Sequence, residues 1–241
     1  MRWTTGQHPI FREESKKMLG QYADTSAAET PGYLRLEDFE REGVRVAERR
    51  YSAKDTIFAP GDPDGQLYFL LEGTVRLYRL YGGYKEATIA LLKDGGVFGE
   101  LTLEATPWQN AFAEAVTYTR VLTVRKPVLT EVIKHRPEFA LKLISSFSER
   151  LRQSDEVIES LLDREVSARL ATLLSHLGDR FGEPDGSGTV LKVRLTHQDL
   201  ANMIVSTREA VSKVMSEFQR DGLIEVRNRT ISVTPQLAEM S

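Results

Sequence analysis

The chain of 241 residues contains no cysteine, which excludes disulfide bonds, redox sensing by a thiolate and an iron–sulfur cluster held by cysteine. It also lacks any run near the roughly 18 uncharged apolar residues that a transmembrane helix needs. The N-terminal segment, MRWTTGQHPIFREESKKM, has no apolar core of a secretory signal. These absences predict a cytoplasmic protein with no membrane partner.

Histidine is scarce, and the signatures of catalysis are missing. The four histidines stand singly, at His8, His135, His176 and His197, so no metal site is predicted. The sequence has neither a glycine-rich phosphate loop nor the strand-turn-helix elbow that carries a nucleophile. We therefore expect no enzyme, no catalytic residue, no bound metal and no haem, and we name no certain cofactor.

The most informative stretch is LTHQDLANMIVSTREAVSKVMSEFQRDG, residues 195–222, which predicts two short helices joined by a tight corner. Thr196 is a good N-cap for the first helix, and Asp199 three residues later completes a variant of the capping box. Ser206 or Thr207 caps the second helix. Gly222 ends it in the manner of a C′ glycine.

The second helix has distinct inner and outer faces. Its apolar residues recur at helical spacing, at Val211, Val214, Met215 and Phe218. Its outward residues near the N-terminus are Arg208, Glu209, Ser212 and Lys213. Arginine can chelate guanine and glutamate can accept from cytosine in the major groove of DNA, so this face suits base reading. The alternative is an ordinary helical hairpin with solvated charges.

Two strand-like runs follow, 223–226 and 230–233, and they flank Arg227-Asn228-Arg229. This pattern predicts a β-hairpin with a basic tip, the wing of a winged helix. The tip is either a phosphate contact, with Arg229 as its candidate, or simply a solvated turn.

Net charge does not assist DNA binding. The whole chain carries −3 at pH 7, and from Arg164 onward ten basic side chains balance ten acidic ones. Affinity for DNA must therefore come from a patch on one face and from dimerisation.

The middle of the chain alternates with period two from Val44. Short strand-like runs at 56–58, 67–71, 75–78, 87–92 and 118–124 are separated by turn signals such as Pro60-Gly61-Asp62-Pro63. Such strands predict an antiparallel roll, which either holds a small ligand or forms a closed core. Together with the helices, this predicts an α+β fold.

A long helix is predicted from Pro137 to about residue 162. Its apolar residues fall on alternating three- and four-residue steps, with Ser154 as the polar member, at Ile144, Phe147, Leu151, Ser154, Ile158 and Leu161. This stripe packs either on the chain's own roll or, in the interpretation we prefer, on a second copy in a parallel homodimer. We also expect a hinge at 163–166, a helix at 168–181, an exposed loop at 182–188 and a strand at 190–195.

The expected organisation is an N-terminal extension (1–40), a β-roll (41–136), a dimerisation helix (137–163) and a winged helix-turn-helix domain (164–241). Over about residues 44–235 the chain resembles the Crp/Fnr transcription regulators. The resemblance is carried by IFAPGDPDGQLYFLLEGTVRLYRL, LLKDGGVFGELTL and STREAVSKVMSEFQRDGLIEV. It implies a roll of the cyclic-nucleotide-binding type and a homodimeric activator that binds double-stranded DNA.

The resemblance also implies roles for particular residues. Arg208 and Glu209 match base-reading positions, with Ser212 beside them, and Lys213 stands where many members have arginine. Lysine lacks the planar fork of arginine, which alters base preference there. The positions that match DNA-backbone contacts are Ser167, Thr196, His197, Gln198 and Thr207, with Arg229 added from the wing. The loop Glu183-Pro184-Asp185-Gly186 matches the surface that touches RNA polymerase in activators.

Control by an effector stays open. Where cyclic-AMP binders have Arg-Ser-Ala, this chain has Gln109-Asn110-Ala111, so no cation is present for the phosphate. The roll is most similar to the cyanobacterial nitrogen regulator branch, which senses 2-oxoglutarate. The candidate pocket residues are Gly99, Glu100, Leu101, Arg150 and Asp155, an incomplete set. The run Phe112-Ala113-Glu114-Ala115 is similar to Thermus and Deinococcus stress-response members, some of which need no effector.

Overall fold

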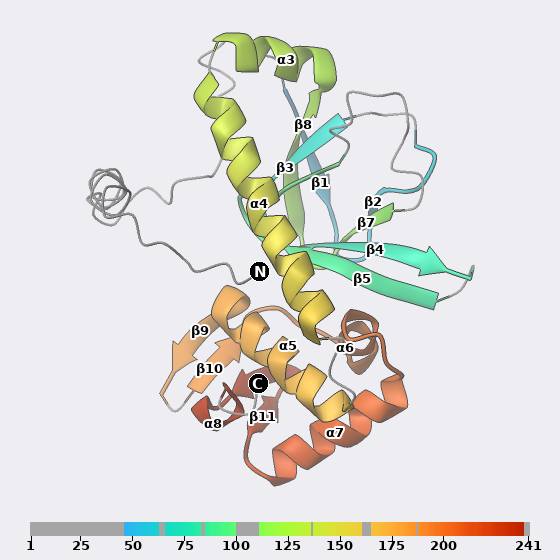
Figure 1. Ribbon diagram of the computed structural model, residues 1–241, viewed down its shortest axis with the longest axis vertical. Coiled ribbons are helices and arrows are strands. Elements are labelled where there is room, and N and C mark those ends of the chain that lie inside the picture. Colours follow the sequence, from blue (N-terminus) through green and yellow to red (C-terminus); the bar gives the residue numbers. More distant parts are fainter. Residues whose placement is uncertain are drawn as a thin grey trace, which may run out of the picture. The chain divides into compact units, whose positions relative to one another are not determined.

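The computed structural model describes residues 46–62, 66–82, 85–99, 111–135, 137–160, 165–186 and 188–238 (Figure 1). The predicted N-terminal extension, residues 163–164 of the predicted hinge and Leu161 of the predicted stripe lie outside these residues. The β-roll and the C-terminal domain belong to one compact unit.

The roll consists of two four-stranded antiparallel sheets. The first has the order β1-β8-β3-β6, with strands Ala47–Tyr51, Thr119–Arg125, Gln66–Glu72 and Val97–Gly99. The second has the order β2-β7-β4-β5, with strands Thr56–Phe58, Ala111–Ala115, Val75–Tyr81 and Lys85–Leu92. The alternating pattern therefore predicted the sheet class correctly.

Strands β6 and β7 were absent from the prediction. In β7 the small residues Ala111, Ala113 and Ala115 are buried, while Phe112 and Glu114 are half-buried on the other face. Alanine has little preference for strands, so the local sequence gives no signal. Pairing of β7 with β2 and β4 determines the strand instead.

Aromatic and aliphatic side chains fill the core between the two sheets. Val75, Phe98 and Val121 are fully buried. The rings of Tyr68 and Phe98 stack at 5.1 Å between centroids, and Phe58 packs beside Tyr68 at 5.5 Å. This packing gives β4 and β5 a rigid base, from which their polar outer face projects.

Two helices follow the roll, α3 (Lys126–His135) and α4 (Pro137–Ser160). Proline lies at the start of α4, as predicted, because its missing N–H costs nothing in a first turn. Phe139 and Leu143 on α4 are buried in the roll's apolar cluster, and Phe147 is partly buried against it. The predicted stripe is thus split, since Phe147 packs on the chain's own roll.

Beside this buried face, α4 carries an exposed apolar stripe. Leu141, Ile144, Leu151 and Ile158 are 65%, 59%, 65% and 60% exposed. Leu141 was not in the predicted stripe. We call these four residues the α4 stripe, and nothing in the described part of the chain covers them.

The C-terminal domain begins with α5 (Val166–Phe181) and contains one small sheet of order β11-β12-β10-β9. Its remaining elements are β9 (Gly182–Asp185), β10 (Gly188–Leu191), α6 (His197–Met203), α7 (Arg208–Arg220), β11 (Ile224–Arg227), β12 (Thr230–Val233) and α8 (Pro235–Ala238).

The predicted loop at 182–188 was wrong, because β9 and β10 form a hairpin there. The strand predicted at 190–195 ends at Leu191. Turn-forming residues hid the hairpin, and Pro184 is tolerated because β9 is an edge strand. Gly182 is required by close packing, since a Cβ there would lie 2.1 Å from Thr189 Cγ2 and 2.2 Å from the Gly178 carbonyl oxygen.

Candidate DNA-binding interface

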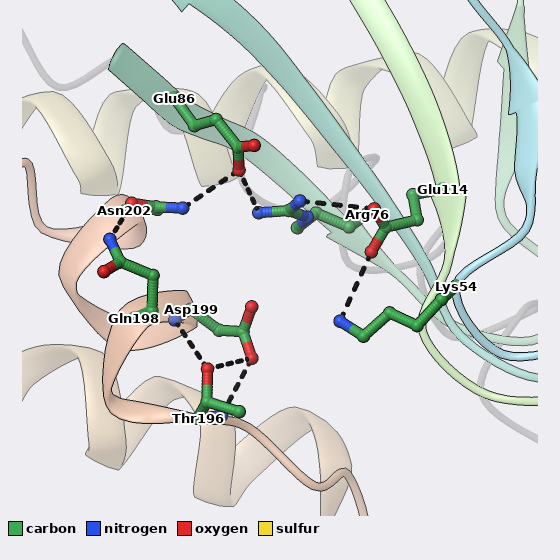
Figure 2. Close-up of polar contacts among 8 residues, drawn as sticks. All are labelled: Lys54, Arg76, Glu86, Glu114, Thr196, Gln198, Asp199 and Asn202. Atoms are coloured by element: carbon green, nitrogen blue, oxygen red, sulfur yellow. Dashed lines mark hydrogen bonds and ion pairs between the residues drawn. The ribbon is translucent and has the colours of Figure 1, made fainter. Parts of the chain in front are cut away.

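The first helix of the motif, α6, begins with the predicted capping box (Figure 2). The backbone N–H of Asp199 donates to Thr196 Oγ1 at 3.1 Å, and the backbone N–H of Thr196 donates to Asp199 Oδ2 at 2.8 Å. Each side chain satisfies a donor that the helix start would otherwise leave unpaired. Three predicted backbone contacts, Thr196, His197 and Gln198, lie in this first turn.

The second helix, α7, presents the predicted reading face. Thr207 caps it, with its Oγ1 accepting from the backbone N–H of Ala210 at 3.2 Å. The four predicted apolar residues, Val211, Val214, Met215 and Phe218, are buried in the domain core. This packing leaves Arg208, Glu209 and Lys213 exposed on the outer face, where a duplex can reach them.

Ser212 differs from the other predicted base-reading residues. It is half-buried, and its Oγ lies 2.8 Å from Nδ1 of His197. The pair joins the first turn of α6 to α7, so His197 has a structural partner within the motif. The Ser212 hydroxyl is thereby engaged inside the motif rather than pointing freely outward.

The wing is present as predicted, with β11 and β12 paired in antiparallel register. Its tip is a two-residue turn, in which Asn228 and Arg229 have φ angles of +51° and +64°. Arg227 pairs with Glu225 on the same strand, and Arg229 is exposed at the tip. Ser167, another predicted backbone contact, is half-buried at the start of α5, and its hydroxyl donates to Glu165 at 3.3 Å.

The structure does not assemble the candidate effector residues into one described site. Gly99 lies in β6 with φ +98°, and a Cβ there would lie 2.4 Å from the Gln66 carbonyl oxygen, so packing alone requires glycine. Asp155 is exposed on α4. Glu100, Leu101, Gln109 and Asn110 lie outside the described residues, as does the side chain of Arg150. The effector pocket therefore stays a prediction.

The described residues contain no group of three or more histidine, aspartate or glutamate side chains placed to hold a metal ion. None of their helices combines the length and apolarity needed to cross a membrane.

Three residues that the sequence did not flag form a polar contact between the roll and α6 (Figure 2). Arg76 on β4 is buried, and its Nη1 donates to Glu86 Oε2 on β5 at 2.9 Å. The same Glu86 oxygen accepts from Asn202 Nδ2 on α6 at 3.0 Å. Asn202 lies in the buried run of α6 with Leu200, Ala201 and Met203, and a polar residue in that run was the available signal.

The surroundings of Arg76 are polar and aromatic. Arg76 Nη2 lies 3.5 Å from Glu114 Oε2 on β7, and its guanidinium carbon lies 4.3 Å from the centroid of the Tyr78 ring. Burial, and then the Glu86 and Glu114 carboxylates, raise the pKa of Tyr78, against a lowering by Arg76. Tyr78 therefore stays neutral near pH 7, and its ring makes a cation–π interaction with the Arg76 guanidinium.

The turn between α6 and α7 contains a strained residue. Val205 has φ +52°, a left-handed conformation that a β-branched side chain rarely adopts, and it is 41% exposed. Relief of about 1–2 kcal/mol of strain outweighs the roughly 0.5–1 kcal/mol entropic cost of glycine. We expect Val205→Gly to raise the melting temperature by about 2 °C, as measured by calorimetry. Val205→Ala, which keeps a Cβ, should give a smaller gain, and a lower melting temperature for the glycine variant would contradict the strain.

Comparison with known proteins matches both parts of the chain. The model of the cyclic nucleotide-binding domain matches residues 48–136, and that of the Crp-like helix-turn-helix domain matches residues 168–240. The chain is 34% identical over 185 residues to the global nitrogen regulator of Nostoc sp., covering 76% of this chain and 83% of that protein. It is 31% identical over 185 residues to the cyclic AMP receptor protein of Thermus thermophilus, covering 77% and 82%.

Solved structures agree in fold. A CRP-family transcriptional regulator from Thermus thermophilus has a TM-score of 0.68 and 28% identity, covering 80% of this chain and 94% of that one. A CooA mutant from Carboxydothermus hydrogenoformans has a TM-score of 0.72, covers 88% and 96%, and at 24% identity shows the fold alone. From the two domain matches and the relatives above 30% identity, the chain belongs to the Crp/Fnr family, whose members are DNA-binding transcription regulators and not enzymes.

Proposed function

We propose that this chain is a homodimeric activator that binds a pseudo-palindromic operator and needs no effector to do so. The observation that carries the proposal is the outer face of α7, where Arg208, Glu209 and Lys213 are exposed above a buried apolar base. In a dimer, two such helices enter adjacent major grooves about 34 Å apart. Because its target is the chromosome, the proposed site of action is the cytoplasm.

The α4 stripe supports the dimer. Ile144, Leu151 and Ile158 recur every seven residues along one side of a long helix, and all three are more than half exposed. Exposed apolar side chains that repeat along one side of a helix mark an interaction surface. The heptad period suits a second copy of the same helix, packed in parallel. Ser154 is half-buried near this stripe and does not interrupt its heptad positions.

Activation requires a contact with RNA polymerase, and we assign it to the β9–β10 hairpin. Glu183, Pro184, Asp185 and Gly186 are exposed there. The hairpin includes the edge strand of the small sheet, so it can reach a protein partner. The family resemblance of this segment, together with its exposure, supports the assignment.

Independence from an effector is supported by the sequence Gln109-Asn110-Ala111, which offers no cation to a cyclic phosphate. The alternative is a ligand-gated regulator that senses 2-oxoglutarate or a cyclic nucleotide. The relatives with names of that kind include a cAMP-activated global transcriptional regulator of Mycobacterium tuberculosis and a cyclic AMP receptor protein of Thermus thermophilus. Arg150 and Asp155 on α4 are this chain's residues for such a pocket.

Selection of bound duplexes from a random pool tests the proposal. Purified protein freed of metabolites is used alone, with cyclic AMP, and with 2-oxoglutarate. We expect a palindromic motif to be enriched without additives. Enrichment only with one additive would replace the proposal by the ligand-gated alternative. No enrichment in any arm would show that α7 does not read DNA under effector-free conditions, against the proposal.

A further inference from the structure

We propose that Glu86 of the roll and Asn202 of α6 are positioning residues for DNA binding: their hydrogen bond orients the helix-turn-helix on the roll and holds Gln198 for its phosphate contact. The five residues Glu114, Arg76, Glu86, Asn202 and Gln198 form one chain of contacts, which we call the junction (Figure 2). The role in DNA binding rests on the proposed function; the orienting role does not.

The roll side of the junction is anchored by a buried cation. The side chain of Arg76 is only 7% exposed, and a buried charge is costly unless carboxylates pair with it. Glu86 and Glu114 supply that pairing from the two neighbouring strands, β5 and β7. Lys54 adds a second contact to Glu114, also at 3.5 Å. The carboxylate of Glu86 is therefore held in place before it meets α6.

The helix side is fixed by hydrogen-bond chemistry. Asn202 is 8% exposed, and its Nδ2 donates to Glu86 while its Oδ1 accepts from Gln198 Nε2 at 2.8 Å. An ionised carboxylate only accepts, so the amide nitrogen of Asn202 must face Glu86 and its oxygen must face Gln198. Gln198 Nε2 has a second N–H, and this is the donor that suits a DNA phosphate.

A second contact along β5 also joins the roll to the C-terminal domain, so the two contacts together can fix the orientation of that domain. Just past the C-terminal end of this strand, Lys93 Nζ donates to the Arg180 carbonyl oxygen at 2.7 Å, and Arg180 Nη2 donates to the Leu91 carbonyl oxygen at 2.9 Å. Leu91 itself is buried in the apolar cluster of the C-terminal domain. A single contact with β5 would leave the C-terminal domain free to rotate on the roll. Two contacts spaced along β5 define the angle of α6 against the roll.

The junction lies beside an open cleft at the N-terminal end of β5. The cleft has a volume of about 350 Å³ and is lined by Lys85, Glu86, Gln198, Asn202 and Val205 together with Ala201 and Ser206. Polar groups at such an interface give direction and register more than they give affinity. Loss of the Glu86–Asn202 bond should therefore alter the angle of the domains more than it alters their stability.

An exchange of amide and carboxylate tests this inference. Asn202→Asp sets two carboxylates against each other and should weaken operator binding roughly tenfold, within the range for directly coupled residues. Glu86→Gln with Asn202→Asp restores one donor and one acceptor across the contact. Because one Glu86 oxygen accepts from both Arg76 and Asn202, the glutamine must turn its amide oxygen to Arg76 and its nitrogen to position 202, so the recovery is expected to be partial. The double variant should bind the operator about threefold more tightly than Asn202→Asp alone. An Asn202→Asp variant with unchanged affinity, or a double variant as weak as the single, would overturn the proposal.

A distance measurement without DNA separates this inference from the proposed function. Because the chain has no cysteine, spin labels can be placed uniquely through Tyr118→Cys on the roll and Gln219→Cys on α7, both exposed. With labelled chains diluted in unlabelled protein, the parent should give one narrow distance distribution. Asn202→Asp should broaden it and the double variant should narrow it again. A distribution unaffected by Asn202→Asp would refute the orienting role even if operator binding failed for every variant.

Asn228→Asp is the matched control for the distance measurement. It makes the same chemical change in the same domain, at an exposed turn position whose left-handed backbone suits aspartate as well as asparagine. Because the substitution lies at the tip of the wing and away from the junction, its distance distribution should equal that of the parent. A control as broad as Asn202→Asp would attribute the effect to added charge and overturn the inference.

Discussion

Replacing Arg208 with alanine is expected to remove the preference of the protein for its operator over random DNA. A bidentate contact between arginine and guanine contributes about 1–3 kcal/mol of discrimination. A symmetric dimer makes the contact twice, so the expected loss is about 2–6 kcal/mol, or at least roughly 30-fold in Kd. The folded domain should survive, because Arg208 is exposed and its helix is capped by Thr207.

Titration of fluorescent duplexes at several salt concentrations measures both parts of this effect. The operator and a scrambled duplex are compared for the parent, Arg208→Ala and Arg208→Lys. The lysine variant keeps the charge but not the planar fork, so it should keep weak binding to both duplexes and lose most of the discrimination. If Arg208→Ala bound the operator as tightly as the parent, α7 would not be the reading helix.

Local chemistry explains why the helix-turn-helix could be predicted so closely from the sequence. The caps at Thr196 and Thr207, the buried positions of α7 and the stop at Gly222 are all set by residues within one or two turns of each other. The wing has the same property, because its strands are adjacent in sequence. Spacing identified these elements, whereas the equally local β9–β10 hairpin was missed because its turn-forming residues hid it.

Elements that depend on distant partners were missed or misplaced. Strand β7 is made by pairing with β2 and β4, which come from elsewhere in the chain. Phe147 fits a heptad as well as Ile144 does, and only the position of the roll decides that it turns inward. The bond between Glu86 and Asn202 joins residues 116 positions apart, so no spacing rule could have found it.

The largest effect on assembly is expected from charging the α4 stripe. Leu151→Glu with Ile158→Glu places four carboxylates in the proposed dimer seam, where burial of an unpaired charge costs several kcal/mol each. The monomer fold should be retained, because these side chains are 65% and 60% exposed in the single chain. We expect a monomer by analytical ultracentrifugation at concentrations where the parent is a dimer. The matched control exchanges the two residues, Leu151→Ile with Ile158→Leu, and keeps the stripe apolar.

Operator binding should follow the loss of the dimer. A dimer binds its second half-site at high effective concentration, an advantage of about 10²–10⁴ in affinity. The charged double variant should lose that advantage and bind a full operator no better than a half-site duplex, whereas the exchanged control should keep the difference. Arg208→Ala, in contrast, should remain a dimer. If the charged variant were still a dimer, the dimer interface would lie elsewhere than on the α4 stripe. If it were a monomer that still preferred the full operator, recognition by α7 would not require two copies of the chain bound to two half-sites.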